Sequence, residues 1–214
     1  MVEKGKGKGG SIKLVLAPEV IEATPEGAEE AAAEVAELYA EEATLYPPVR
    51  EVIENGWAKN RNIKPDVVET TARQGKTPTG GPWTRPDVVS VAVQQFTHLP
   101  GKFIEVVTFE IKPSNNVTVL AVYEALAQRR SATHAYAALH VPPDDESRLA
   151  EDIDRVLTAA RAHGIGVIIA GDPANYDTWD EREVAERVEP DPADLDQFIS
   201  VQLGGREVIR DAVR

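Results

Sequence analysis

Hydrophobic and polar residues alternate with two different periods along the chain, and the period predicts which segments are strands and which are helices. The runs PDVVSVAV (86–93) and KFIEVVTFEIK (102–112) are rich in β-branched and aromatic residues, and the turn-like QQFTHLPG separates them. This pattern is typical of adjacent antiparallel strands. The apolar runs HAYAALHV (134–141) and GIGVIIAG (164–171) predict two further, buried strands.

Apolar residues at helical spacing predict helices between these strands. One helix is expected between the second and third strands, and another runs from Glu146 to about His163. The first of them has an apolar stripe made by Val119, Val122, Tyr123 and Leu126.

Proline next to a capping residue marks helix starts near both ends of the chain. Thr24-Pro25 is expected to open an Ala/Glu-rich helix that ends at about Thr44, and Asp191-Pro192 opens a short C-terminal helix. A second helix is predicted to begin at the double proline Pro47-Pro48 and to end at Gly56. The resulting order is helix, two or three antiparallel strands, helix, strand, helix, strand, which is an α/β fold with a mixed β-sheet flanked by helices.

The tetrapeptide Pro-Asp-Val-Val occurs twice, at residues 65–68 and 86–89. Each copy is suited to the start of a strand, because proline sets the direction of the chain and aspartate tolerates a turn. We expect both copies to start strands. Only the second opens the run that can pair directly with residues 103–112.

Composition narrows the class of protein. A chain of 214 residues with 42% hydrophobic residues can bury one good core, so a single domain with appendages is the expectation. The chain has no cysteine, and its four histidines lack metal-ligand spacing, which argues against zinc and iron-sulfur sites. No apolar run approaches the roughly 18 residues of a membrane span, and the N-terminus lacks the apolar segment of a signal peptide. We therefore expect a soluble, cytoplasmic protein that does not bind membranes.

Charge is distributed unevenly along the chain. The net charge is −13, which on its own argues against a nucleic-acid partner. However, residues 144–214 carry 18 acidic and 8 basic side chains, whereas residues 56–86 carry 6 basic and 2 acidic ones around a Gly/Pro/Thr-rich loop. This basic segment is the candidate nucleic-acid-binding surface. Its candidate contact residues are Lys59, Arg61, Arg73, Lys76 and Arg85.

The strand over residues 103–112 carries the candidate chemistry. Glu110 and Lys112 share one face because side chains alternate along a strand, and an antiparallel neighbour that begins at Asp87 would bring this aspartate beside them. Two adjacent carboxylates repel each other unless a cation joins them. Mg2+ or Mn2+ would suit Asp87, Glu110 and the backbone carbonyl of Ile111 as ligands, and Lys112 would orient or help deprotonate an attacking water. The pattern predicts metal-dependent hydrolysis of phosphodiester bonds.

The residues Pro86-Asp87 and Glu110-Ile111-Lys112 resemble the PD-(D/E)xK motif of the restriction-endonuclease-like nuclease superfamily. The resemblance implies an αβββαβ core, a Mg2+-dependent endodeoxyribonuclease acting on DNA, metal binding by Asp87 and Glu110, and a water-orienting role for Lys112. The runs WTRPDVV, FEIKP and EALAQRR also resemble bacterial proteins of restriction or phage defence. Restriction-like enzymes often dimerise, so a homodimer or a partner subunit is a further expectation.

The same resemblance suggests auxiliary residues. The helix after the motif often supplies a polar residue to the site, and Gln128 and Arg129 are the candidates. Related nucleases often carry another glutamate near the start of the first core helix, where this chain has Tyr46-Pro47-Pro48. Glu51 is the candidate substitute, or the site holds its metal with fewer protein ligands.

The resemblance also sets the expected domain boundaries. We expect the nuclease-like core at residues 45–170, between an N-terminal strand and helix extension (11–44) and an acidic C-terminal helical extension (171–214). Residues 1–10, which alternate lysine and glycine, are expected to form a flexible basic tail.

Two other classes of function stay open. The high negative charge and the missing first-helix glutamate favour a nuclease-like binding or assembly subunit whose catalysis is weak or absent. A small-molecule hydrolase has less support, because the chain contains neither the G-x-S-x-G pattern nor a Gly-rich phosphate loop.

Overall fold

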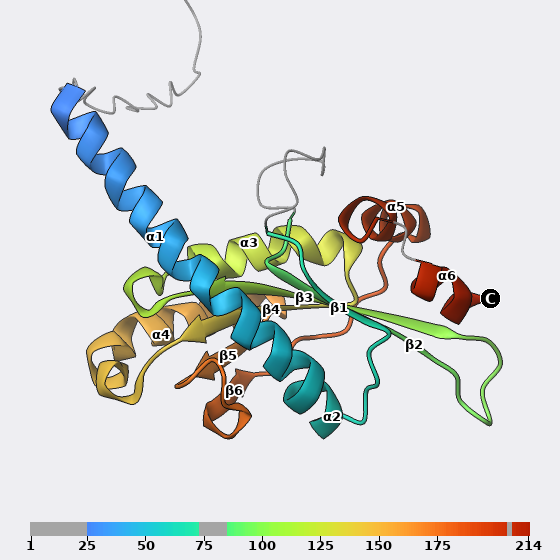
Figure 1. Ribbon diagram of the computed structural model, residues 1–214. Helices are drawn as coiled ribbons and strands as arrows, with labels where there is room; N and C mark the ends of the chain where they lie inside the picture. The colour runs from blue at the N-terminus through green and yellow to red at the C-terminus, as the bar shows by residue number, and fades with distance from the viewer. Residues whose placement is uncertain (1–24, 73–84, 205–206) are drawn as a thin grey trace, which may run out of the picture. The chain divides into compact units, whose positions relative to one another are not determined.

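A mixed β-sheet forms the centre of the fold in the computed structural model, which describes residues 25–72, 85–204 and 207–214 (Figure 1). Six strands of these residues form one sheet in sequence order, with antiparallel pairing from the first to the third strand, parallel pairing from the third to the fifth, and antiparallel pairing at the last. The strands are β1 (Val67–Thr70), β2 (Val88–Gln94), β3 (Phe103–Lys112), β4 (His134–His140), β5 (Gly166–Ala170) and β6 (Trp179–Glu183).

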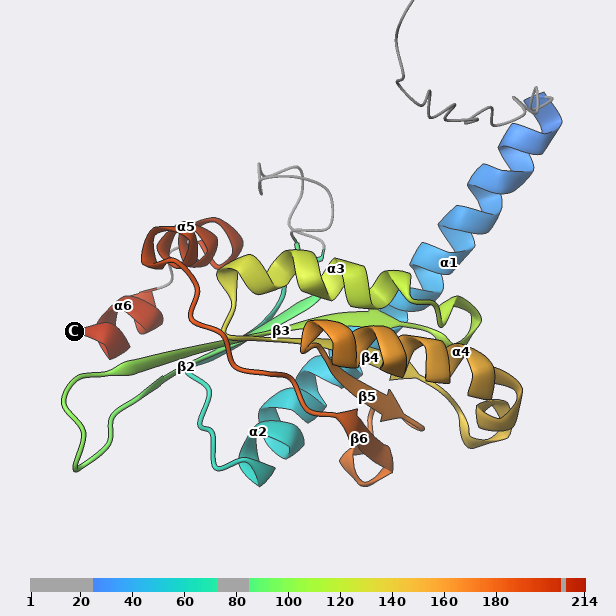
Figure 2. The same cartoon turned by 180° about the vertical axis from the view of Figure 1, so that it is seen from behind.

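Helices cover both faces of this sheet, as Figures 1 and 2 show from opposite sides. The helical elements are α1 (Pro25–Val52), the π-helix η1 (Ile53–Trp57), α2 (Ala58–Asn60), α3 (Leu120–Gln128), α4 (Pro143–His163), α5 (Pro192–Gln202) and α6 (Glu207–Val213). Short 3-10 turns lie at Ser114–Asn116, Arg129–Ser131 and Tyr176–Thr178. None of the helices in the described ranges has the length and apolar character needed to cross a membrane. The expectation of an α/β fold with a mixed, helix-flanked sheet is confirmed.

The chain divides into residues 1–35 and residues 36–214, and the packing described below belongs to the second unit. On one face of the sheet, the end of α1 together with η1 packs Val49, Ile53 and Trp57 against Phe109 and Tyr136. On the opposite face, α3 and α4 pack against β4 and β5, and α5 and α6 pack against β1, β2 and β3. The sheet is therefore buried on both faces, as the apolar strands predict.

The alternation predicted for β3 is present. Val107, Phe109 and Ile111 lie in the core under α1. Glu110 and Lys112 lie on the other face and are nevertheless buried, with exposed fractions of 6% and 8%. Burial of two charged residues is costly unless they are paired, so both side chains at this end of β3 need polar partners.

The prediction of a helix boundary at Pro47-Pro48 is wrong, because α1 runs without interruption to Val52. A proline inside a helix costs about 3 kcal/mol. Leu45, Val49 and Ile53, which follow one another at helical spacing, are buried along this segment and supply the compensating core contacts. Helical structure also continues past Gly56 through η1 and α2.

The apolar stripe predicted for α3 is only partly correct. Val122 is fully buried, but Val119 and Tyr123 are exposed by 36% and 44%. The face that packs against the sheet is made by small residues, Ala121 and Ala125, together with Val122 and the polar Gln128. Small side chains let α3 lie close to the sheet, and this brings its polar residues to the end of β3.

The C-terminal segment contains a strand that the hydrophobic pattern does not predict. The sequence of β6, WDERE, is mostly charged, and its residues alternate between half-buried and exposed. Charged residues on an edge strand protect the sheet from pairing with other chains. Helix α5, in contrast, begins as predicted, with the Asp191 carboxylate accepting a hydrogen bond from the backbone N–H of Ala193 at 2.8 Å.

The two Pro-Asp-Val-Val copies start β1 and β2, as predicted, but their aspartates make different contacts. The Asp66 carboxylate accepts a hydrogen bond from the backbone N–H of Val93 at 2.7 Å, so it stabilises the ladder between β1 and β2. Asp87 lies at the opposite end of β2, where its backbone N–H donates to the carbonyl of Phe109. Only Asp87 is therefore placed beside the charged end of β3.

Candidate active site

The residues predicted to carry the chemistry lie together at the end of β2 and β3. Val88 pairs with Phe109 in the antiparallel ladder, which sets Asp87 beside the end of β3. The Oδ2 atom of Asp87 accepts a hydrogen bond from the backbone N–H of Ile111 at 2.8 Å. The Oε1 atom of Glu110 lies 2.7 Å from the Nζ atom of Lys112. The strand register thus holds the aspartate, the glutamate and the lysine in one small volume.

Helix α1 adds two residues that the sequence does not single out, Glu42 and Tyr46. The Tyr46 hydroxyl donates to Oε1 of Glu42 at 2.7 Å, and Lys112 Nζ donates to Oε2 of Glu42 at 3.3 Å. Glu42 is only 6% exposed. Glu42 provides a glutamate from the first helix, but it lies one turn before Tyr46-Pro47-Pro48, where the resemblance implies that glutamate. Glu51, the candidate for that position, is exposed to solvent and lies outside the cluster.

Helix α3 contributes a further carboxylate and an amide. Gln128 Nε2 donates to Oε2 of Glu110 at 2.6 Å, so this predicted auxiliary residue contacts the cluster. Glu124, one turn earlier on the same helix, places Oε2 3.0 Å from Lys112 Nζ. No pattern in the sequence points to Glu124, because a single glutamate in an amphipathic helix is usually a solvated residue.

Burial and the excess of negative over positive charge in the cluster raise the pKa values of Asp87 and Glu110. Burial, followed by repulsion from Glu42, raises the pKa of Asp87 to about 7, against the opposing effects of the Ile111 N–H and Lys112. Burial and then Asp87 raise the pKa of Glu110 well above its usual value. Burial opposes the charge of Lys112, but Glu110 and Glu42 outweigh it and raise the lysine pKa above its usual range. Lys112 is therefore protonated at neutral pH.

These side chains surround a cavity of about 240 Å3. Its volume suits a phosphate group or a small hydrated ion better than a drug-sized ligand, for which pockets start at about 300 Å3. Arg85, one of the predicted nucleic-acid contacts, lies in its wall. The lining residues are Tyr39, Glu42, Tyr46, Ala72, Arg85, Asp87, Glu110, Lys112 and Glu124.

The carboxylates of this cluster are suitable ligands for a divalent cation, but in this structure they surround the ammonium of Lys112. Buried carboxylate oxygens with raised pKa values are the donors that Mg2+ and Mn2+ prefer, and a cation would relieve their repulsion. Within residues 25–72, 85–204 and 207–214, however, no group of three or more histidine or acidic side chains is disposed to hold a metal. One oxygen each of Glu42, Glu110 and Glu124 is directed instead at Lys112 Nζ.

Several other predicted residues lie away from this cavity. Arg129 donates to the backbone carbonyl of His163, and its Nη2 atom lies 3.6 Å from Glu186. The guanidinium of Arg61 stacks 3.9 Å above the Trp57 ring and pairs with Glu181 on β6.

Of the three remaining predicted nucleic-acid contacts, the structure describes one. Lys59 is exposed in α2 and does not line the cavity. Arg73 and Lys76 lie outside the described residues.

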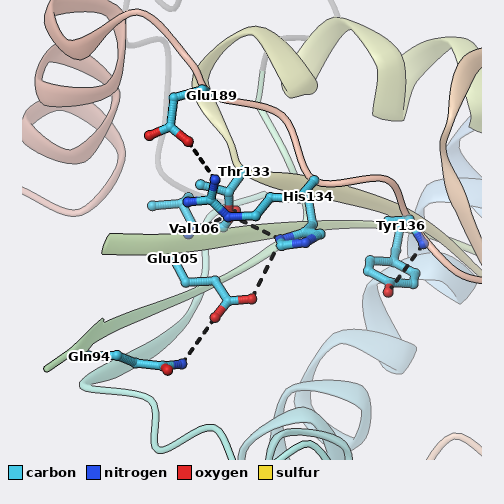
Figure 3. A network of polar contacts seen from close by, with 9 residues as sticks. Gln94, Glu105, Val106, Thr133, His134, Tyr136 and Glu189 are labelled. Atoms are coloured by element: carbon cyan, nitrogen blue, oxygen red, sulfur yellow. Dashed lines mark hydrogen bonds and ion pairs between the residues drawn. The ribbon is translucent and has the colours of Figure 1, made fainter. Parts of the chain in front are cut away.

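A second polar network lies at the opposite end of β3 and β4 (Figure 3). His134 Nδ1 lies 3.5 Å from Glu105 Oε1 and 3.1 Å from the Thr133 hydroxyl, and Gln94 donates to the other oxygen of Glu105 at 3.1 Å. Burial, helped by Arg187, lowers the pKa of His134 to about 4. A neutral histidine held by these neighbours fits a structural role.

Comparisons with models of protein families, with curated proteins and with solved structures gave no match to this chain. The geometry of the cluster is therefore what supports a function.

Proposed function

We propose that this protein is a divalent-metal-dependent nuclease of the PD-(D/E)xK type that hydrolyses phosphodiester bonds in DNA. One observation carries the proposal: Asp87, Glu110 and Lys112 lie together, buried, at the end of two paired strands. The order of α1, β1 to β3, α3 and β4 is also the αβββαβ order that the motif implies. Bacterial restriction or phage defence is the setting that the sequence motifs suggest.

The carboxylates of Asp87, Glu110 and Glu42 are the residues that would hold the metal. Bound there, a divalent cation would lower the pKa of a bound water and neutralise charge on the scissile phosphate. Gln128 donates to one oxygen of Glu110 and so orients this carboxylate.

Lys112 acts as a cation in this scheme rather than as a base. Its raised pKa keeps it protonated, so its ammonium can donate hydrogen bonds to the attacking water or to the charge that develops on phosphate. Arg85 lines the same cavity, and in the proposed reaction its guanidinium would pair with a phosphate oxygen of the substrate.

The test is cleavage of supercoiled plasmid DNA by the purified protein with Mg2+, with Mn2+ and with EDTA. Asp87→Asn should abolish metal-dependent cutting and Lys112→Ala should slow it at least about 100-fold, while circular dichroism and the unfolding midpoint show a folded protein. Asp66→Asn is the matched control, because it makes the same substitution in the same tetrapeptide and should leave cutting intact. Cutting in EDTA, or wild-type activity in Asp87→Asn, would refute the proposal.

A nuclease-like binding subunit without catalysis is the second candidate. The observation that favours it is the contact of Lys112 with Glu42, Glu110 and Glu124, because these pairs already neutralise part of the charge that a metal would neutralise. Calorimetric titration with Mn2+ separates the two candidates. A nuclease should bind Mn2+ and lose this binding in Glu110→Ala, whereas a subunit without a metal site gives no binding heat in either protein.

A further inference from the structure

Glu124 is the member of the charged cluster that the proposed reaction leaves without a role. Its carboxylate comes from the middle of α3, its side chain is 13% exposed, and Oε2 lies 3.0 Å from Lys112 Nζ. This contact is an ion pair, and among the described residues Oε2 of Glu124 has no hydrogen-bond partner. A carboxylate with so little solvent contact needs a neighbouring cation, and Lys112 is placed to supply it.

Lys112 is held from three directions by three different elements. Among the described residues, its Nζ atom lies 2.7 Å from Glu110 on β3, 3.0 Å from Glu124 on α3 and 3.3 Å from Glu42 on α1. An ammonium group has three N–H donors on a flexible four-carbon stem, so its position depends on the partners around it.

The three carboxylates differ in what else they face. Glu42 and Glu110 both interact with Asp87, and this repulsion is part of what a bound cation would relieve, whereas the repulsion from Glu124 acts on Glu110. In the proposed function these two carboxylates give oxygens to the metal. Glu124 is the one of the three whose contact with Lys112 does not compete with that role.

We propose that Glu124 is the positioning residue of Lys112: its carboxylate fixes the ammonium beside the metal-binding carboxylates and takes no part in holding the metal. This inference rests on the proposed function, because it assigns the residue that orients the lysine of the same site. It makes α3 a supporting element of the site at two successive turns, through Glu124 to Lys112 and through Gln128 to Glu110.

Glu124→Gln tests the inference with two readouts, because glutamine keeps the shape of the side chain and removes its charge. The rate of plasmid cleavage at saturating Mn2+ should fall at least about 10-fold, while the calorimetric affinity for Mn2+ stays within about 2-fold of wild type. Glu54→Gln is the matched control, because it removes a half-exposed glutamate that pairs with Arg50 at 3.0 Å and lies outside the cavity lining. It should change neither quantity. If Glu124→Gln loses as much Mn2+ affinity as Asp87→Asn does, Glu124 is a metal ligand. If its rate of plasmid cleavage is unchanged, Glu124 has no role in the reaction. Either result overturns the inference.

A double-mutant cycle with Lys112→Met shows whether Glu124 acts through the lysine. If it does, the double variant should cut DNA no more slowly than Lys112→Met alone. Rate losses that multiply would instead mean an independent role for Glu124 and would overturn the inference.

The same cycle measured by urea unfolding in EDTA does not depend on catalysis. Removing Glu124 should lower the unfolding midpoint in the wild-type background, where it takes a partner from Lys112. In the Lys112→Met background it should not lower the midpoint, because there it removes a carboxylate that has lost its cation. If the wild type neither cuts DNA nor binds Mn2+, the proposed function fails. If Glu124→Gln shifts the unfolding midpoint equally with and without Lys112, the pairing of Glu124 with Lys112 is overturned.

Discussion

Asp87→Asn should make the protein more stable in EDTA at neutral pH, although it should also destroy nuclease activity. Asp87 is 6% exposed and lies near the charges of Glu42 and Glu110. Asparagine has nearly the same shape, and its carbonyl oxygen can still accept the hydrogen bond from Ile111 N–H. The substitution therefore removes a buried, repelled charge and keeps the backbone contact.

The magnitude follows from the raised pKa of the carboxyl. Each pKa unit is worth about 1.4 kcal/mol, so raising the pKa of Asp87 from 3.8 to about 7 costs the folded protein about 4 kcal/mol once the group is ionised. The lost attraction to Lys112 offsets part of the gain. We expect the free energy of unfolding to rise by about 2–4 kcal/mol at pH 8.

The pH dependence has a definite sign. At about pH 4 and below, the Asp87 carboxyl is protonated in both the folded and the unfolded chain, and the wild type and the variant should have similar stability. Between about pH 4 and 7 the unfolded chain releases the proton while the folded protein keeps it, so the wild type loses stability as the pH rises. Above about pH 7 the difference should level off.

Urea unfolding in EDTA, followed by circular dichroism from pH 4.5 to 8.5, measures this difference. Glu51→Gln is the control, because Glu51 is exposed and its substitution should change the free energy of unfolding by less than about 0.5 kcal/mol. Adding Mn2+ should then stabilise the wild type and leave Asp87→Asn unchanged. The reasoning fails if Asp87→Asn is less stable than wild type at pH 8 in EDTA, or if the difference does not vary with pH.

Three further predictions concern other charged residues of the fold. Glu42→Gln should reduce Mn2+-dependent plasmid cleavage by at least about 100-fold, and Glu51→Gln should not, which checks that Glu42 is the first-helix glutamate of the site. Lys112→Met should lower the free energy of unfolding in EDTA by about 3–5 kcal/mol at pH 8, because three buried carboxylates lose their cation; a variant as stable as wild type would contradict this. Because the pKa of His134 is low in the folded protein, the unfolded chain takes up a proton first as the pH falls, and the free energy of unfolding of the wild type should drop by about 2–3 kcal/mol relative to His134→Gln between about pH 6.5 and 4. Equal pH profiles of the two proteins in urea unfolding would rule this out.

Local patterns were enough to place the strand end of the site. Alternation along residues 103–112 sets Glu110 and Lys112 on one face, and a short hairpin allows only a few registers with residues 86–93. The pairing of Val88 with Phe109 is one of these, and it brings Asp87 to its place. The repeated Pro-Asp-Val-Val is ambiguous by itself, and the difference between Asp66 and Asp87 comes from which end of β2 each one meets.

The helical contributions could not be predicted in the same way. Glu42 is one of many glutamates in an Ala/Glu-rich helix, and nothing in the local pattern separates it from its exposed neighbours. Its burial depends on α1 continuing through Pro47 and Pro48, which the local cost of proline argues against and the core contacts of Val49 and Ile53 permit. Glu124 is likewise an ordinary helical glutamate until α3 packs closely on the sheet through its alanines.

The sequence by itself determined strands β1 to β5, the α/β class and the identity of Asp87, Glu110 and Lys112 as candidates, because strand alternation and hairpin pairing act over short stretches of chain. Only the tertiary structure decided that Glu42, Glu124 and Gln128 join them, and that Glu51 and Arg129 do not. The physical reason is that a helix presents a different residue at every 100° of rotation, and its rotation and distance from the sheet are set by packing against side chains far away in the sequence.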